Sequence, residues 1–244
     1  MAARSGTASD RVFRDLCSRM FSGALAPGDK LPTQRRLAAE LGVNMGPVRE
    51  ALKRLEQLGV IDVRHGDAMR VLDWRTHAGL DVLASIGQSA SLSPEILDSA
   101  LEARRLLLGQ ASCLAAERRA PETIAELRAT VDGIRRLGDE EDASQLDLRF
   151  CQQIAHASGN VVFALMFNSM RQVSDADPEL FTALTVRPSE LVPMYETVID
   201  CIESGDARSA ESAAGRLAAA QELRLHESAA YAVDPTPPRD PATS

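Results

Sequence analysis

The sequence lacks any long apolar run. No stretch of its 244 residues approaches the roughly 20 apolar residues that cross a bilayer, and the N-terminal MAARSGTASDR has no apolar core of the signal-peptide kind. Paired cysteines are also missing, since no C-x-x-C motif or disulfide-type spacing connects the four that are present: Cys17, Cys113, Cys151 and Cys201. We therefore expect a soluble, unexported protein of the cytoplasm that keeps its thiols reduced.

Motifs of the common enzyme classes are absent as well. There is no P-loop, dinucleotide fingerprint, nucleophile elbow or H-E-x-x-H around the four histidines, which are His65, His77, His156 and His226. A catalytic Cys–His pair that is brought together only by folding is the alternative. Turnover of an acyl thioester by the isolated rear domain would support it. We expect no catalytic residue and no cofactor.

Charge is distributed unevenly along the chain. The formal net charge is −8, but residues 1–72 hold 12 Lys and Arg against 8 Asp and Glu, whereas residues 73–244 hold 15 against 27. The length favours two domains. A basic front domain beside an acidic rear domain indicates that only the front domain meets a polyanion.

The front segment, residues 1–72, has the pattern of a winged helix–turn–helix domain. Apolar spacing and cap residues predict helices over residues 9–21, 33–41 and 44–58, with Ser9, Thr33 and Asn44 as N-caps and Gly42 in the turn. Short β-type runs at 60–63 and 69–71 flank the turn-forming His65-Gly66-Asp67. Three helices followed by a hairpin make this fold.

The third helix carries the predicted DNA-reading face. Its buried positions should be Val48, Ala51, Leu52 and Leu55, which leaves Met45, Gly46, Arg49 and Lys53 on the opposite side. An α-helix fits the major groove, and arginine reaches guanine edges and phosphates with two hydrogen bonds. Arg35 on the second helix and Arg54 on the third lie where such contacts would form. A solvated basic face on a protein-docking module is the alternative.

The rear of the chain is expected to be all α. Residues 73–78 read as a linker, residues 79–232 as an antiparallel helical bundle and residues 233–244 as a Pro-rich disordered tail. The 3.6-residue period predicts seven helices, over residues 79–89, 94–119, 121–137, 140–157, 160–174, 188–204 and 206–231. The fold class is therefore mainly α, with a winged helix–turn–helix before a bundle.

The front segment resembles the GntR superfamily of bacterial transcriptional regulators. The resemblance rests on PGDKLPTQRRLAAELGVNMGPVREALKRLEQLGVI, which holds L-P-x-x-R-x-L-A and G-V-x-x-x-x-V-R-E-A-L-x-x-L-x-x-x-G. It implies binding to double-stranded DNA, with contacts from these residues: Arg35, Asn44, Met45, Gly46, Arg49, His65 and Gly66. Relatives often carry arginine in place of Met45 and a hydroxyl or another small polar residue in place of Gly46, so the operator need not match theirs.

The rear segment resembles the FadR subfamily, whose C-terminal bundle dimerises and holds a small effector. The matching pieces are WRTHAGLDVLASI, LEARRLLLGQASCLAAERRA, LDLRFCQQIAHASGN and IESGDARSA. Many relatives bind a divalent metal there through an Asp-x-x-x-His pair and two further histidines. Here Asp147 matches the aspartate, but Cys151, Tyr195 and Leu217 replace the histidines. We expect no metal, because such a site needs at least three ligands; a soft-metal site at Asp147 and Cys151 is the alternative.

The resemblance also implies an effector site in the bundle. This chain lacks the metal-binding histidines and has apolar residues on the last helix. In both respects it resembles the fatty acyl-CoA-responsive members of the subfamily. The expected effector-binding residues are Arg104, Tyr195 and three residues spaced four apart on one face of the last helix: Leu217, Gln221 and Leu225. Arg104 could instead pair with an acidic neighbour, the leucines could be ordinary core, and a small carboxylate metabolite is the alternative effector. A DNA binder without any effector would leave the helical domain unexplained.

Overall fold

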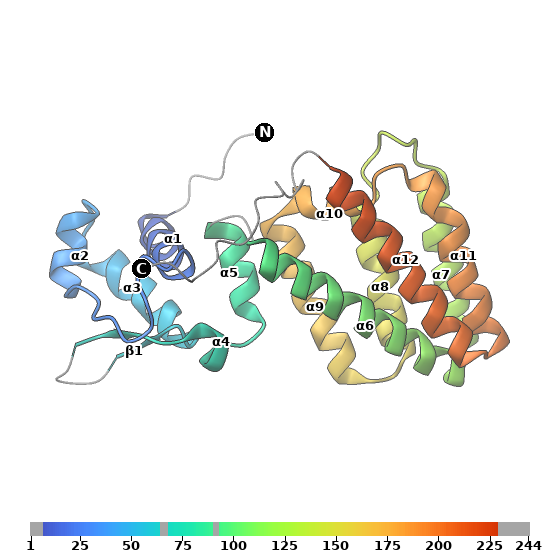
Figure 1. Cartoon of the computed structure of the whole chain (residues 1–244), viewed down its shortest axis with the longest axis horizontal. Coiled ribbons are helices and arrows are strands. Elements are labelled where there is room, and N and C mark those ends of the chain that lie inside the picture. The colour runs from blue at the N-terminus through green and yellow to red at the C-terminus, as the bar shows by residue number, and fades with distance from the viewer. Residues whose placement is uncertain (1–6, 64–67, 90–92, 229–244) are drawn as a thin grey trace, which may run out of the picture. The chain divides into compact units, whose positions relative to one another are not determined.

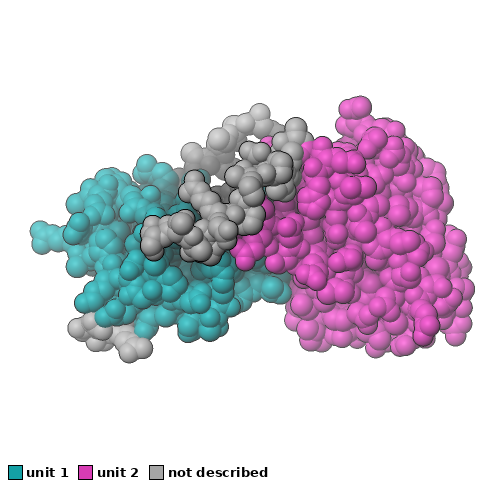
Figure 2. Space-filling model, viewed as in Figure 1, with its two compact units in different colours: residues 1–92, 169–177 teal, residues 93–168, 178–244 magenta. Residues whose placement is uncertain are grey.

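The computed structural model describes residues 7–63, 68–89 and 93–228, and these are mainly α-helical (Figure 1). The chain divides into two compact units (Figure 2). Unit 1 comprises residues 1–92 and 169–177, and unit 2 comprises residues 93–168 and 178–244. The predicted fold class, with a helix–turn–helix and small wing before a helical domain, is confirmed. His65, Gly66 and the tail at 233–244 lie outside the described residues.

Unit 1 begins with three helices, α1 (Ala8–Phe21), α2 (Gln34–Glu40) and α3 (Met45–Gln57). α1 starts two residues earlier than expected, because Thr7 rather than Ser9 is the N-cap and forms a reciprocal capping box with Asp10; Ser9 is buried within the helix instead. Thr33 caps α2 as predicted, by accepting from Arg36 N. α3 packs against α1 and α2 through its four predicted core residues, which are buried: Val48, Ala51, Leu52 and Leu55.

The wing is a two-stranded antiparallel sheet that follows α3. Strand β1 (Ile61–Asp62) pairs with β2 (Arg70–Val71), so both strands are shorter than the predicted β-type runs. Gly59 turns the chain from α3 toward β1 at φ +70°. A Cβ at this glycine would lie 2.7 Å from the His77 carbonyl oxygen. Both the left-handed backbone and the close approach therefore require glycine here.

The predicted linker and the start of the predicted bundle are organised differently from the expectation. A short helix, α4 (Trp74–His77), lies within the segment expected to be irregular, and the Asp73 side chain caps it by accepting from Arg75 N. The next helix, α5 (Asp81–Ser89), packs against α1 and belongs to unit 1, although we expected it in the rear domain. Periodicity predicts an amphipathic helix but does not identify the surface that its apolar face will cover.

Unit 2 is a helical bundle. α6 packs along α12 and also contacts α8 and α11, while α7 packs against α8 and α11. The helices that lie wholly in unit 2 are α6 (Pro94–Arg118), α7 (Pro121–Arg135), α8 (Ser144–Ala157), α10 (Pro178–Leu184), α11 (Pro188–Ser204) and α12 (Ala207–Glu227). α9 (Val161–Ala176) contributes residues to both units. Within the described part of the chain, no helix is long and apolar enough to cross a membrane.

The start of α8 and the presence of α10 differ from the predicted elements of unit 2. α8 begins at Ser144 rather than Glu140, because acidic side chains accept from backbone N–H groups before it: Glu141 from Gly138 N at 2.7 Å and Asp142 from Ser144 N at 2.9 Å. Such local bonds compete with helix formation. The short helix α10 was not predicted at all. Seven residues make too few turns for a clear apolar period.

Candidate functional site

The candidate DNA interface lies on the exposed faces of α2 and α3. Arg35, Arg49 and Lys53 are all exposed. Gly46 is also exposed, and a Cβ there would meet no atom within 4 Å. Met45 is half-buried at the start of α3. The residues predicted to face DNA on α3 therefore lie opposite its buried stripe, and this face is open to a ligand.

The start of α3 offers backbone donors as well as side chains. Asn44 is exposed at the N-cap, but its side chain makes no capping hydrogen bond. The first N–H groups of a helix lack intrahelical partners and carry a partial positive charge, which suits phosphate. Arg49 Nε lies 3.4 Å from Gln34 Oε1, a long hydrogen bond that joins α3 to the first residue of α2. The two helices thus present one continuous polar surface.

Arg54 does not belong to this surface, although its position on α3 suggested that it would. Its Nη1 donates to Asp10 Oδ1 at 2.8 Å, and its guanidinium carbon lies 4.1 Å from the Phe13 ring centroid. Both partners are on α1. Arg54 therefore holds α3 against α1, and Arg49 is the exposed arginine of this helix.

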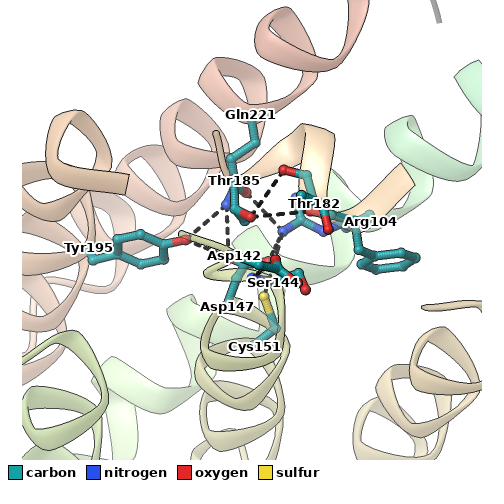
Figure 3. Close-up of polar contacts among 10 residues, drawn as sticks. Arg104, Asp142, Ser144, Asp147, Cys151, Thr182, Thr185, Tyr195 and Gln221 are labelled. Carbon is teal, nitrogen blue, oxygen red and sulfur yellow. Dashed lines mark hydrogen bonds and ion pairs between the residues drawn. The ribbon is translucent and has the colours of Figure 1, made fainter. Parts of the chain in front are cut away.

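The second candidate site is a buried polar cluster inside unit 2. Arg104 from α6, Asp147 and Cys151 from α8, Tyr195 from α11 and Gln221 from α12 converge there (Figure 3). The side chains of Arg104 and Asp147 are 6% and 2% exposed, and the other three residues are also buried. The structure thus brings together three of the five predicted effector residues, and it adds Asp147 and Cys151 to them.

Asp147 is the hub of the cluster. Its Oδ2 accepts from Arg104 Nη2 at 3.0 Å, and its Oδ1 accepts from Tyr195 Oη at 2.6 Å and from Gln221 Nε2 at 2.8 Å. Arg104 Nη2 also donates to Gln221 Oε1 at 2.8 Å and lies 3.8 Å from Cys151 Sγ. The carboxylate therefore has three donors in the interior, as a buried charge requires.

Burial and charge decide the protonation states in the cluster. Burial lowers the pKa of Arg104, but the charge of Asp147 acts in the opposite direction, and the net pKa is raised. Burial and then Asp147 raise the pKa of Tyr195 well above its usual value. The same two causes raise the pKa of Cys151 to about 12. At neutral pH the cluster holds a guanidinium, a neutral phenol and a neutral thiol.

A metal ion does not fit this cluster. The guanidinium of Arg104 already pairs with Asp147, so a divalent cation would meet a like charge beside its only carboxylate ligand. Metal binding at Cys151 would also have to displace its proton, which burial and the charge of Asp147 oppose by raising the pKa of the thiol. Among the described residues, no three His, Cys, Asp or Glu side chains gather in a way that could hold a metal.

The two remaining predicted effector residues belong to the same helix as Gln221. Leu217 and Leu225 lie one turn before and one turn after it on α12, and both are fully buried. Phe150 packs edge-on against Tyr195, with ring centroids 4.9 Å apart, and fixes the phenol ring. The expected alternative for Arg104, an ion pair with an acidic neighbour, is present, and the partner is Asp147.

Comparisons with known proteins agree with this division of the chain. The family model described as bacterial regulatory proteins, gntR family, matches residues 8–71, and the FCD domain model matches residues 99–220. The HTH-type transcriptional regulator Mce2R of Mycobacterium tuberculosis is 38% identical over 213 residues, which cover 84% of this chain and 86% of the relative. The fatty acid metabolism regulator protein of Cronobacter sakazakii is 29% identical over 169 residues, covering 68% and 67%.

A solved structure supports the fold alone. Escherichia coli McbR/YncC superposes with a TM-score of 0.51 at 21% identity and covers 91% of this chain and 98% of its own. The two matched families together account for both the winged helix–turn–helix and the bundle, and the relatives are regulators rather than enzymes. The chain therefore belongs to the gntR family of bacterial transcriptional regulators, is FadR-like, and carries an FCD domain after its DNA-binding domain.

Proposed function

We propose that the protein acts in the cytoplasm as a homodimer that binds a pseudo-palindromic operator and releases it when a fatty acyl-CoA binds inside unit 2. The observation that carries the DNA part is the exposed basic face of α2 and α3 beside the N-terminus of α3, whose cap makes no side-chain bond. A two-fold dimer presents two such faces, so its preferred site has two-fold symmetry as well.

The side chains of the interface divide into base-facing and phosphate-facing groups. Arg49, Met45 and Gly46 face base edges from the first turns of α3, while Arg35 and Lys53 contact phosphate. Met45 offers an apolar contact where a basic residue would bind guanine. The wing residues His65 and Gly66 are proposed to reach the flanking DNA. Phosphate contacts make the affinity fall with ionic strength.

The effector part is supported by the chemistry of the buried cluster. Arg104 supplies a buried guanidinium for the polar end of a ligand, with Tyr195 and Gln221 beside it. Leu217 and Leu225 supply apolar surface on the same helix, where an acyl chain gains about 0.8 kcal/mol for each buried CH₂. The name of the Cronobacter sakazakii relative, a fatty acid metabolism regulator, favours the same ligand class.

Release of DNA requires that the effector prefer one state of the protein. Both leucines are fully buried, so an acyl chain reaches them only if the bundle opens around α12. A ligand that binds the opened state better shifts the population toward it. We propose that this state places the two recognition helices of the dimer at a spacing that does not match one operator.

A genomic binding selection tests the DNA part of the proposal. Fragments bound by the folded protein should be enriched in one pseudo-palindrome, and long-chain acyl-CoA should release them. Selection without two-fold enrichment would contradict the dimer, whereas release by a small carboxylate but not by acyl-CoA would favour the alternative effector class.

A further inference from the structure

The guanidinium of Arg104 is only partly used by the protein. Nη2 contacts Asp147, Gln221 and Cys151, but Nη1 is buried and has no hydrogen-bond partner within the described part of the chain. The residue as a whole is 5% exposed. A buried charged donor without a partner is unfavourable. Nη1 is therefore a donor that a bound acceptor can satisfy.

The carboxylate of Asp147 already balances the positive charge of the Arg104 guanidinium. Asp147 Oδ2 lies 3.0 Å from Arg104 Nη2, and both side chains are almost completely buried. Tyr195 and Gln221 are neutral, and Cys151 keeps its proton because its pKa is raised to about 12. The neighbouring charges on α6 and α12 form a second opposite pair, Arg105 and Glu222, 3.9 Å apart. In both pairs an arginine of α6 is matched by a carboxylate.

We propose that Asp147 selects effectors by charge, so that the site prefers a neutral carbonyl, such as a thioester or amide, over the matching free carboxylate. This inference rests on the proposed effector function and names the chemistry of its polar end. A carboxylate on Nη1 would share one guanidinium with Asp147, and two anions in a desolvated site repel each other. A thioester or amide oxygen accepts the same hydrogen bond without adding a charge.

The wild-type protein gives the first test. Binding of decanamide and decanoate to the full chain is measured by titration calorimetry at neutral pH, with decanoyl-CoA as the proposed effector class. The two probes differ only at the polar end, so any difference in affinity comes from that end. Because only the carboxylate adds a charge beside Asp147, the amide should bind at least about tenfold more tightly, a difference of about 1.4 kcal/mol. Equal or tighter binding of the carboxylate would overturn the role of Asp147.

Charge-changing variants give the second test. Asp147→Asn keeps the shape of the side chain but removes the negative charge that balances Arg104. The order of affinities should therefore reverse, and decanoate should bind more tightly than decanamide. The double variant Arg104→Gln with Asp147→Asn removes both charges and should bind the two probes with similar affinity. Asp132→Asn removes an exposed carboxylate from α7 and should keep the wild-type preference.

The outcomes separate this inference from the proposed function. If decanoyl-CoA binds and Asp147→Asn leaves the preference between amide and acid unchanged, the charge selection is wrong and the acyl-CoA effector stands. If decanoyl-CoA, the amide and the acid all fail to bind wild type, the effector class itself is wrong. The wild-type comparison decides the inference even if the Asp147→Asn protein does not fold.

Discussion

The thiol of Cys151 reports on the buried cluster at the scale of a single residue. Burial is the largest cause of its raised pKa and the charge of Asp147 is the second, while Arg104 opposes both. The folded chain therefore keeps this proton at pH values where the unfolded chain loses it. Unfolding between pH 9.0, the usual pKa, and about pH 12 releases one proton from this group.

We expect the release of this proton on unfolding to lower the free energy of unfolding as the pH rises above 9.0. The contribution of Cys151 is fully present below the unfolded pKa and is lost as pH rises toward 12, at up to about 1.4 kcal/mol per pH unit. Urea unfolding of wild type and Cys151→Ala, followed from about pH 8 to about pH 11, measures the difference in slope. The variant should show the shallower alkaline decline, and identical slopes would contradict the assigned burial.

Arg49 and Lys53 provide a second pair of residue-scale predictions. Both are exposed on α3, but Arg49 lies nearer its N-terminus, where base edges are read. Arg49→Ala should cost about 1–3 kcal/mol on the preferred operator and reduce discrimination between sequences. Lys53→Ala should weaken binding to all DNA sequences alike and should reduce the slope of log affinity against log salt concentration by about 1. Equal loss of discrimination in both variants, measured by titration at two salt concentrations, would contradict these roles.

The sequence identified members of the buried site but not their pairing. Arg104 and Tyr195 were predicted from the family pattern and Gln221 from the helix stripe that it shares with Leu217 and Leu225, whereas Asp147 was noted only as the remnant of a metal set. The partners of Asp147 are distant in the chain, with Arg104 43 residues before it and Gln221 74 residues after it. Periodicity predicts which side chains share a helix face, whereas the neighbour across that face depends on how the helices pack.

At the scale of elements, Arg54 fixes how α3 docks on α1. Its ion pair with Asp10 is partly exposed, with side chains 38% and 40% accessible, so it contributes at most about 1 kcal/mol. Its position over Phe13 adds about 0.5–1 kcal/mol. We expect Arg54→Ala to lower the free energy of unfolding by about 1 kcal/mol.

Arg49→Ala is the matched control for this prediction, because both arginines lie on α3. Urea unfolding and operator titration of the two variants should show opposite patterns, with Arg54→Ala affecting mainly stability and Arg49→Ala mainly DNA affinity. A large loss of operator affinity in stable Arg54→Ala protein would return Arg54 to the DNA-facing set.

Some boundaries of the long helices were predictable, although α12 ends at Glu227, four residues before its expected end. The expected range 188–204 is the observed α11, and α6 ends one residue before the expected Arg119. The prediction failed where local polar bonds or short length decide the structure. Asp142 and Glu141 accept from backbone N–H groups and delay the start of α8, and α10 has only seven residues, beginning at Pro178.

At the scale of the whole molecule, the effector and the operator are expected to be linked. One binds the FCD domain and the other binds the winged helix–turn–helix, so any effect of one on the other is a coupling free energy between distinct sites. Thermodynamic linkage makes this coupling reciprocal. If decanoyl-CoA or a longer homologue weakens operator binding by a given factor, the operator must weaken acyl-CoA binding by the same factor, typically about 5–150-fold.

Titration calorimetry of an acyl-CoA series, with and without saturating operator, measures both sides of this linkage. Affinity should rise with chain length, because each added CH₂ is buried at about 0.8 kcal/mol until the apolar surface beside Leu217 and Leu225 is filled. The operator should lower every affinity in the series by one common factor, because it acts on the equilibrium between protein states and not on the ligand. Affinity that is indifferent both to chain length and to operator would exclude acyl-CoA as the regulating ligand and would point to a small polar effector.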